Sequence, residues 1–414
     1  MPYNDAKKGG TPRAFQMSMK ITDFSIYPVA TPPPHLGGEC WLFVVLQTDG
    51  GVCGVGEAYS IPFRPRTAAT MLADVCERHV VGANPFNIES LWRVMYSGSY
   101  TQRPDPSLGA VMSAVEMACW DIVGKECGVP VHALLGGCIR DKLRTYTYLY
   151  PEEGDTEDVY VVADVAAKRA AEYAKQGFTA VKFDPAGAYT AFDPRQLSLD
   201  ELTRSELFAR KIREAVGGQC DLLFGTHGQM TPAAAVRLAK RLESSDPLWL
   251  EEPVPPDNPQ AMAKVARATS ISVAAGERLT TKYEYANLLS CGGAAILQPN
   301  TGKCGGILEA KKIAAIAETH YAQIAPHLYC GPIVGAANAQ LAASIPNFLI
   351  LEGIKQWDGF SADVLKTPLQ WQDGFLIVPK TPGLGVELNC EFAAAHPYNG
   401  DKMMHPRPSL QPMD

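Results

Sequence analysis

The 414-residue sequence lacks the features of disulfide-stabilised, zinc-ribbon and nucleic-acid-binding proteins. Its eleven cysteines include no CxxC pair, and several lie inside apolar runs, as reduced core thiols do. Lys and Arg number 37 against 44 Asp and Glu, which gives a formal charge of −7, and the basic residues are scattered. We therefore expect no disulfide framework, no zinc ribbon and no nucleic-acid partner.

Signals for membrane targeting are also missing. The polar start of the chain has no apolar segment of the kind found in signal peptides, and no apolar run is long enough to span a bilayer. We expect a soluble, cytoplasmic protein without a membrane partner. Residues 1–18 carry Gly, Pro, Lys and Asn without periodicity, which predicts a disordered leader.

Residues 19–140 show strand patterns first and helical patterns afterwards. The runs ITDFSIYPVA and CWLFVVLQTDGGVCGVGEAYS predict a β-meander, with a hairpin at 49–51. Helical periodicity follows over 67–81 and 107–127, and PVHALLGG predicts a further short helix. Strands followed by helices, segregated in this way, indicate an α+β domain.

From 141 to 365 short apolar strands alternate with amphipathic helices such as TPAAAVRLAKRLESS and GILEAKKIAAIAETHY. The expected strands cover 145–150, 180–184, 221–225, 248–252, 272–276, 295–298, 323–326 and 348–352. Eight strands joined by helices predict a closed α/β barrel of the (β/α)8 type. Residues 366–414 lack this alternation, and we expect them to pack back on the first domain.

Two predicted strands end abruptly in carboxylates. PLWLEEP ends in Glu251 and Glu252, and ISVAAGERL carries Glu277 directly after its strand. A single residue of this kind is better explained as a solvated loop carboxylate. Two at matching places in neighbouring units predict a divalent-cation site, because barrel strand ends are rigid and hard cations prefer oxygen ligands.

Polar side chains end the other predicted strands as well. They are Lys182, Asp184, His227, Gln298, Asn300, His327 and Glu352. Taken alone, His327 is better explained as a hydrogen-bonded structural residue, but its place in this series favours catalysis. A lysine, a histidine and carboxylates on one rim are the groups that remove a proton α to a metal-bound carboxylate.

The order of these motifs resembles the enolase superfamily, mandelate racemase subgroup. The resemblance rests on the strand-two lysine, EEP, GE, QPN before a GG-led helix, the strand-seven histidine and the strand-eight glutamate. It extends to CGVGEA and SAVEMACWDIVGKECGVPVHALLGG in the first domain. Within the subgroup, KFDP, HGQ and PNFLILEG are similar to acid-sugar dehydratases of the gluconate and galactonate type and to sugar-acid cycloisomerases.

The resemblance implies a modified TIM-like (β/α)8 barrel with an N-terminal α+β capping domain that the C-terminal tail completes. It also implies a lid near 32–39, a Mg²⁺ ion that binds the substrate carboxylate, and a homo-oligomer. Glu251 and Glu277 match metal ligands, and Lys182 matches the lysine beside that carboxylate. His327 matches the strand-seven acid or base, and Glu352 matches the strand-eight hydrogen-bond partner.

Three positions depart from the family pattern. Gly225 stands where the first metal ligand is expected, so we expect His227 to complete the metal site, with Asp184 as the other substitute. Asp184 also replaces the second lysine, and Asn300 replaces the aspartate that orients His327. Without the second lysine, the two-base arrangement of a racemase is incomplete, which favours elimination.

The expected function is metal-assisted α-proton abstraction from a small sugar acid, followed by β-elimination to a 2-keto-3-deoxy acid. One alternative is a cycloisomerase that opens the ring of a sugar acid such as 3,6-anhydrogalactonate or galactarolactone by the same elimination. Another is a sugar-acid-binding protein without turnover, which Gly225 favours. Buried Lys182, His327 and glutamates would cost stability without a role, which argues against that binder.

Overall fold

The computed structural model describes residues 18–400 except 60, 99, 101, 153 and 188–194, so the predicted leader lies outside the described residues but for Ser18.

Cysteines are distributed over the whole described chain, and all eleven are free thiols. The expectation of no disulfide framework is confirmed.

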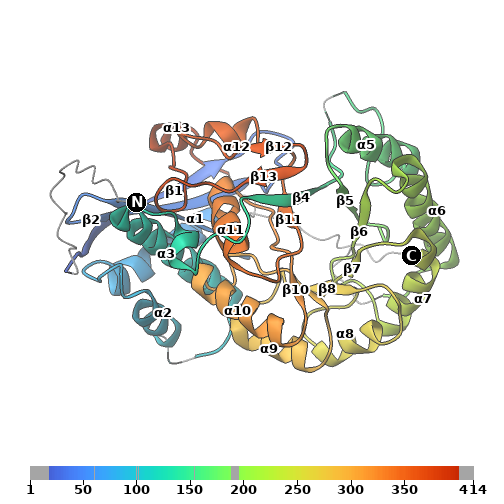
Figure 1. Ribbon diagram of the computed structural model, residues 1–414, viewed down its shortest axis with the longest axis horizontal. Helices are drawn as coiled ribbons and strands as arrows, with labels where there is room; N and C mark the ends of the chain where they lie inside the picture. Colours follow the sequence, from blue (N-terminus) through green and yellow to red (C-terminus); the bar gives the residue numbers. More distant parts are fainter. Residues whose placement is uncertain are drawn as a thin grey trace, which may run out of the picture.

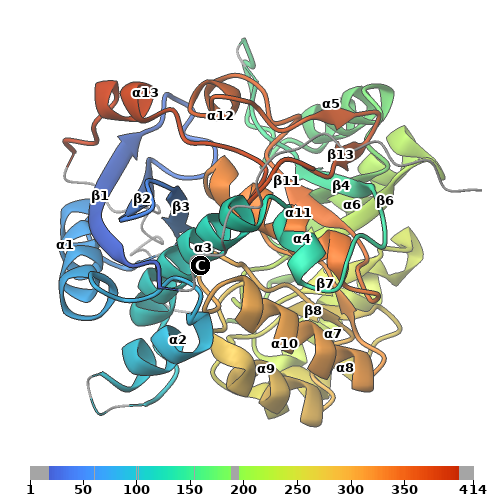
Figure 2. The same ribbon diagram turned by 60° about the vertical axis from the view of Figure 1, so that its left-hand side comes forward.

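An antiparallel three-stranded sheet opens the described chain, as predicted. Its strands are β1 (Ile21–Ala30), β2 (Cys40–Thr48) and β3 (Cys53–Ala58). The helices that follow are α1 (Pro65–Val75), the π-helical turn η1 (Cys76–Val80), α2 (Ile88–Ser97), α3 (Pro106–Cys127) and α4 (Val131–Leu134). Figure 2 shows this sheet and its helices beside the larger domain. The predicted helix over 67–81 is divided into α1 and η1, and α2 was not predicted.

Helix α3 is the core element of the first domain. Its contact with β3 is so close that only glycine fits at two positions. A Cβ at Gly54 would lie 2.1 Å from the carbonyl oxygen of Ala118, and a Cβ at Gly56 would lie 1.8 Å from the carbonyl oxygen of Ala114. The glycines of CGVGEA are therefore required by packing. By length and hydropathy α3 could cross a membrane, but 89% of its most apolar 18 residues are buried inside the protein, as in the core helix of a soluble protein.

Eight parallel strands form the barrel that the sequence predicts. They are β4 (Lys142–Tyr148), β5 (Ala180–Phe183), β6 (Asp221–Gly225), β7 (Trp249–Glu251), β8 (Val273–Ala275), β9 (Ile296–Leu297), β10 (Gln323–Ile324) and β11 (Leu351–Gly353). Each pairs with its sequence neighbour from β4 to β10, and β11 pairs with β4. A parallel bridge between Ile324 and Phe348 closes the circle.

Helices cover the outside of this barrel (Figure 1). They are α5 (Ala163–Lys175), α6 (Leu199–Val216), α7 (Pro232–Leu242) with the 3-10 turn η2 (Glu243–Ser245), α8 (Pro259–Ala266), α9 (Thr281–Ser290), α10 (Ile307–Thr319) and α11 (Pro332–Ser344). Most strands are shorter than predicted, and several lose residues at both ends.

The barrel interior is filled by one apolar side chain from each strand or its extension. This layer consists of Tyr146, Ala180, Leu223, Trp249, Ala274, Ile296, Ala325 and Ile350. Alternation along a strand places the residues two positions further on the same inner side. Those residues, which we call the mouth layer, are Tyr148, Lys182, Gly225, Glu251, Gly276, Gln298, His327 and Glu352.

The C-terminal segment contacts both parts of the molecule. It contains α12 (Phe360–Asp363), β12 (Trp371–Gln372), β13 (Phe375–Ile377) and α13 (Cys390–Ala395). Strand β13 pairs with β4, whereas the amide of Ala30 in β1 donates to the carbonyl of His396 over 2.9 Å. Both views place α13 near β1. The division at 140 and 365 stays a prediction.

Candidate functional site

Lys182 is the central cation of the mouth layer. Its Nζ lies 2.6 Å from Oε1 of Glu251 and 3.4 Å from Oε1 of Glu352, and only 2% of the side chain is exposed. Burial alone would disfavour the ammonium, but the two carboxylates outweigh it and raise the pKa of Lys182 above its ordinary value. Lys182 is therefore a fixed positive charge.

Glu251 is held by protein donors on both carboxylate oxygens. Oε1 takes the contact with Lys182, while Oε2 accepts from Nε1 of Trp249 at 3.1 Å and from Nε2 of Gln298 at 2.6 Å. Trp249 belongs to the apolar layer below, so the barrel core itself orients this carboxylate. The sequence reasoning did not assign a role to Trp249 or Gln298, although alternation along the strands places Gln298 in the mouth layer.

The hydrogen bonds of Asn300 determine which ring nitrogen of His327 carries the proton. The amide N–H of Gly302 donates to Oδ1 of Asn300 over 2.8 Å, so Nδ2 faces Nδ1 of His327, 3.0 Å away. An amide nitrogen only donates, so Nδ1 of His327 accepts, and the neutral ring carries its proton on Nε2. Burial outweighs Glu277 and Glu352 and lowers the pKa of His327, which keeps this ring neutral.

Nε2 of His327 faces the carboxylates of the mouth. It lies 3.5 Å from Oε2 of Glu277 and 3.8 Å from Oε2 of Glu352. Glu352 is fixed in turn by the backbone amide of Leu328, which donates to Oε2 over 2.8 Å. The structure thus brings His327, Glu277, Glu352 and Lys182 together, as the sequence predicted.

His227 has the opposite arrangement to His327. Its Nδ1 lies 3.0 Å from Oδ2 of Asp184, and a carboxylate only accepts, so Nδ1 donates and Nε2 is the nitrogen that can take a proton. Burial favours the neutral ring, but the hydrogen bond and charge of Asp184 outweigh it and raise the pKa of His227 to about 9. His227 and Asp184 form a histidine–carboxylate pair.

The expected metal ligands do not come together as a ligand set. Among the described residues no group of three His, Cys, Asp or Glu side chains is arranged to hold a metal ion. Glu251 is occupied by Lys182, Trp249 and Gln298, and the Nδ1 of His227 is turned to Asp184. The donors present therefore do not fit a divalent cation bound by Glu251, Glu277 and His227.

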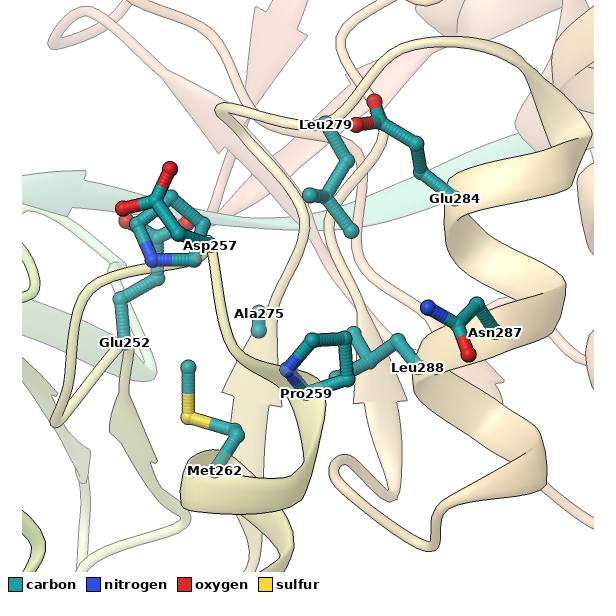
Figure 3. A pocket seen from close by; sticks show the side chains of 10 residues that line it. Glu252, Asp257, Pro259, Met262, Ala275, Leu279, Glu284, Asn287 and Leu288 are labelled. Carbon is teal, nitrogen blue, oxygen red and sulfur yellow. The ribbon is translucent and has the colours of Figure 1, made fainter. Parts of the chain in front are cut away.

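Glu252 points away from the mouth, although the sequence placed it there beside Glu251. Its Oε2 accepts from Nε of Arg278 over 2.6 Å, and neighbouring residues on a strand face opposite sides. Its side chain lines a separate cavity of about 230 Å³ between α8 and α9, shown in Figure 3 with Asp257 and Glu284. This cavity lies outside the barrel mouth.

The first domain adds residues that the sequence reasoning did not single out. The ring of Tyr59 lies 5.4 Å from that of His327 and 5.8 Å from Nζ of Lys303, which is 6% exposed. Burial lowers the pKa of Lys303. The predicted lid segment also reaches the barrel, because a Cβ at Gly37 would lie 3.0 Å from the carbonyl oxygen of Cys330.

Sequence families match most of the chain. Residues 24–136 match the mandelate racemase / muconate lactonizing enzyme N-terminal domain, and residues 165–393 match the enolase C-terminal domain-like family. A mandelate racemase/muconate lactonizing enzyme from Sulfitobacter sp. superposes with a TM-score of 0.93 at 46% identity and covers 96% of this chain and all of its own. One from Jannaschia sp. CCS1 has a TM-score of 0.90 at 47% identity, over 93% and 99% of the two chains.

Two relatives carry names that state an activity. D-xylonate dehydratase of Haloferax volcanii is 32% identical over 89% of this chain and 88% of its own length. D-galactonate dehydratase of Ralstonia pickettii is 33% identical over 90% and 92%. Dehydratases of this kind are lyases, the enzyme class that the sequence predicts. The chain is an enzyme of the enolase superfamily and belongs to its mandelate racemase/muconate lactonizing enzyme group.

Proposed function

We propose that the protein is an acid-sugar dehydratase. The observation that carries the proposal is a pair of histidines with complementary Nδ1 partners on opposite sides of the mouth. His227 follows β6 and His327 follows β10, four strands apart in a circle of eight. Elimination needs one group that takes a proton and another that gives one. The dehydratase names of the relatives support the same reaction class.

His327 supplies the hydrogen-bond donor to the leaving group in this mechanism. Because Asn300 donates to Nδ1, the neutral ring presents Nε2–H to the mouth. That N–H donates a hydrogen bond to the hydroxyl oxygen on the β-carbon as the carbon–oxygen bond breaks, and the departing hydroxide becomes water with the proton that the base has taken from the α-carbon. Glu277 and Glu352 lie 3.5 and 3.8 Å from Nε2 and help to orient the ring.

His227 supplies the base. Once it has lost its proton, Asp184 keeps Nδ1–H fixed and leaves Nε2 to take the α-proton, which yields an enediolate. The ammonium of Lys182 stabilises that developing negative charge, and Glu352 helps to fix the ammonium in place. After the elimination, the enol product takes up a proton at carbon three and becomes a 2-keto-3-deoxy acid.

Members of the enolase superfamily generally use a divalent metal, and the resemblance suggested Mg²⁺ for this chain. No step of the proposed mechanism is routed through Mg²⁺, since the donors described above do not fit it. We also propose a cytoplasmic location from the missing targeting signals, domains at 19–140, 141–365 and 366–414 from the strand and helix patterns, and a homo-oligomer from the resemblance. Light scattering after gel filtration tests the oligomer, and limited proteolysis tests the boundaries.

Product formation from a panel of acids tests the proposed function. The panel contains pentonates, hexonates, hexarates and anhydrohexonates, and the reaction is followed by detection of the 2-keto-3-deoxy group. We expect dehydration of at least one open-chain acid. Product from anhydro acids alone would replace dehydration by ring opening, and no product from any member would end the proposal.

Two variants separate the acid from the base when the reaction runs in D₂O. We expect His327→Gln to keep exchange of the α-proton while product formation falls by about 10² to 10⁴, the usual effect of removing a proton-transfer group. His227→Gln should abolish both. His320→Gln, at an exposed position, is the matched control. Exchange that survives in His227→Gln and disappears in His327→Gln would reverse the two roles.

A further inference from the structure

The cation of the barrel mouth is a side chain of this protein. Lys182 is 2% exposed and its Nζ contacts Glu251 and Glu352 directly. The rings of Tyr146 and Tyr148 flank it, with their centroids 5.9 and 5.8 Å from Nζ. A buried ammonium with two carboxylates and two aromatic faces is held in place by charge, hydrogen bonding and cation–π contacts.

Glu251 has no oxygen free of protein donors. Lys182 contacts Oε1 at 2.6 Å, and the side chains of Trp249 and Gln298 both donate to Oε2. A cation that bound this carboxylate would find one acceptor position left, on Oε1, directly beside the ammonium 2.6 Å from the same oxygen. Two positive charges this close disfavour each other.

Gly225 provides the room that Lys182 uses. A Cβ at Gly225 would lie 3.2 Å from Cε of Lys182, which is closer than ordinary packing allows, and 3.6 Å from Oη of Tyr148. A side chain at this position would therefore press on the lysine stem. The structure places Lys182 directly beside the position at which the expected metal ligand is missing.

We propose that the ammonium of Lys182 is the resident cation of this site, in the place where the superfamily generally holds a divalent metal. It neutralises Glu251 and Glu352 and leaves its remaining hydrogen-bonding capacity for an anionic oxygen of the bound acid. That this oxygen belongs to an enediolate rests on the proposed function. The replacement of the metal rests on the contacts of Lys182, Glu251 and Gly225 alone.

Metal content and thermal unfolding test the replacement without any substrate. The full-length protein, purified without chelator, is analysed for bound divalent metals and melted with and without added Mg²⁺ or EDTA. We expect no stoichiometric metal and no shift of Tm in the wild type. Lys182→Ala leaves Glu251 and Glu352 without their cation, so added Mg²⁺ should raise its Tm, as a ligand of the folded state does. Lys264→Ala, at an exposed position on α8, should behave as the wild type.

Two outcomes would overturn the proposal. One is a wild type that carries about one metal per chain whose removal by EDTA lowers Tm. The other is a folded Lys182→Ala protein that does not respond to Mg²⁺. If Lys182→Ala does not fold, Lys182→Gln takes its place, and the wild-type measurement still decides. A wild type without turnover on any acid, with or without Mg²⁺, would end the proposed dehydratase activity and leave the metal result standing.

Discussion

At the scale of single residues, one amide sets the chemistry of His327. An aspartate at position 300 would accept a hydrogen bond from Nδ1–H of His327 and leave Nε2 as a base. Asn300 instead presents Nδ2 to the ring, because the backbone N–H of Gly302 already donates to Oδ1. The exchange of an oxygen for an NH₂ group therefore turns the strand-seven histidine from an acceptor into a donor.

The variant Asn300→Asp tests this tautomer. The fold should be kept, because Gly302 still finds an acceptor, while the proton of the neutral ring moves from Nε2 to Nδ1. Nitrogen NMR of His327 in the resting enzyme reads the tautomer directly. We expect dehydration to fall by about 10² or more, the usual effect of losing a positioned acid.

Asn287→Asp, at an exposed position on α9, is the control for a newly introduced carboxylate. A ring of His327 that already carries its proton on Nδ1 in the wild type would contradict the assignment. Normal turnover in Asn300→Asp together with a changed tautomer would show that the proton on Nε2 is not used.

At the scale of elements, two carboxylates from the first domain dock at the N-termini of barrel helices. Glu116 of α3 accepts from the amides of Ile307 and Leu308 at the start of α10, over 2.7 and 2.8 Å. Glu57 of β3 accepts from the amide of Val334 in the first turn of α11, over 2.9 Å. Helix N-termini carry unpaired N–H groups and a partial positive charge, so each contact joins the domains and caps a helix at once.

Gly306 makes the Glu116 contact possible. It has φ +99°, and a Cβ there would lie 2.0 Å from Oε2 of Glu116. Gly306→Ala should therefore lower the free energy of unfolding by about 3 kcal/mol through backbone strain and displacement of the carboxylate. Denaturant titration measures the loss. Gly218→Ala, where a Cβ meets nothing within 4 Å, is the control, and equal effects of the two substitutions would contradict the docking role.

The sequence predicts the barrel better than it predicts the contacts inside it. Strand ends and their polar residues follow from hydrophobic alternation, so Lys182, Glu251, His327 and Glu352 are found correctly at one mouth. Helix α2 was not predicted although Ile88, Leu91, Trp92 and Met95 are buried at helical spacing. That signal was present in the sequence.

Three features of the site needed the folded structure. Two of the three donors to Glu251, Lys182 and Gln298, lie 69 and 47 residues away from it in sequence. The amide of Asn300 is oriented by a backbone N–H, which no side-chain pattern reveals. Glu252 turns outward because the chain leaves the strand there, with φ +41°. Each depends on tertiary contacts, which local propensity does not specify.

At the scale of the whole molecule, two carboxyl groups, those of Glu57 and Glu116, are buried at the interface between the domains. Burial raises the pKa of Glu57 to about 8, against the lowering effect of the backbone amides that it accepts from. Burial raises the pKa of Glu116 to about 7 in the same way. Both groups start from an ordinary value of 4.5. At a pH between the ordinary and the raised pKa values, Glu57 and Glu116 are therefore protonated in the folded chain and ionised in the unfolded chain.

This difference predicts that alkaline conditions weaken the interface. Between about pH 4.5 and 8 the folded state binds more protons than the unfolded state at Glu57 and Glu116, so their contribution to stability falls as pH rises and is lost through the folded-state pKa values.

Melting the wild type and the double variant Glu57→Gln, Glu116→Gln from pH 5 to 9 isolates this contribution from that of other carboxylates. We expect the Tm of the wild type minus that of the double variant to fall as pH rises, since the variant cannot lose these protons. The control is Glu214→Gln, at an exposed position on α6, which should follow the wild type at every pH. A Tm of the wild type that instead rises relative to that of the double variant as pH rises would mean that both carboxylates are ionised in the fold and bind the helix N-termini as anions.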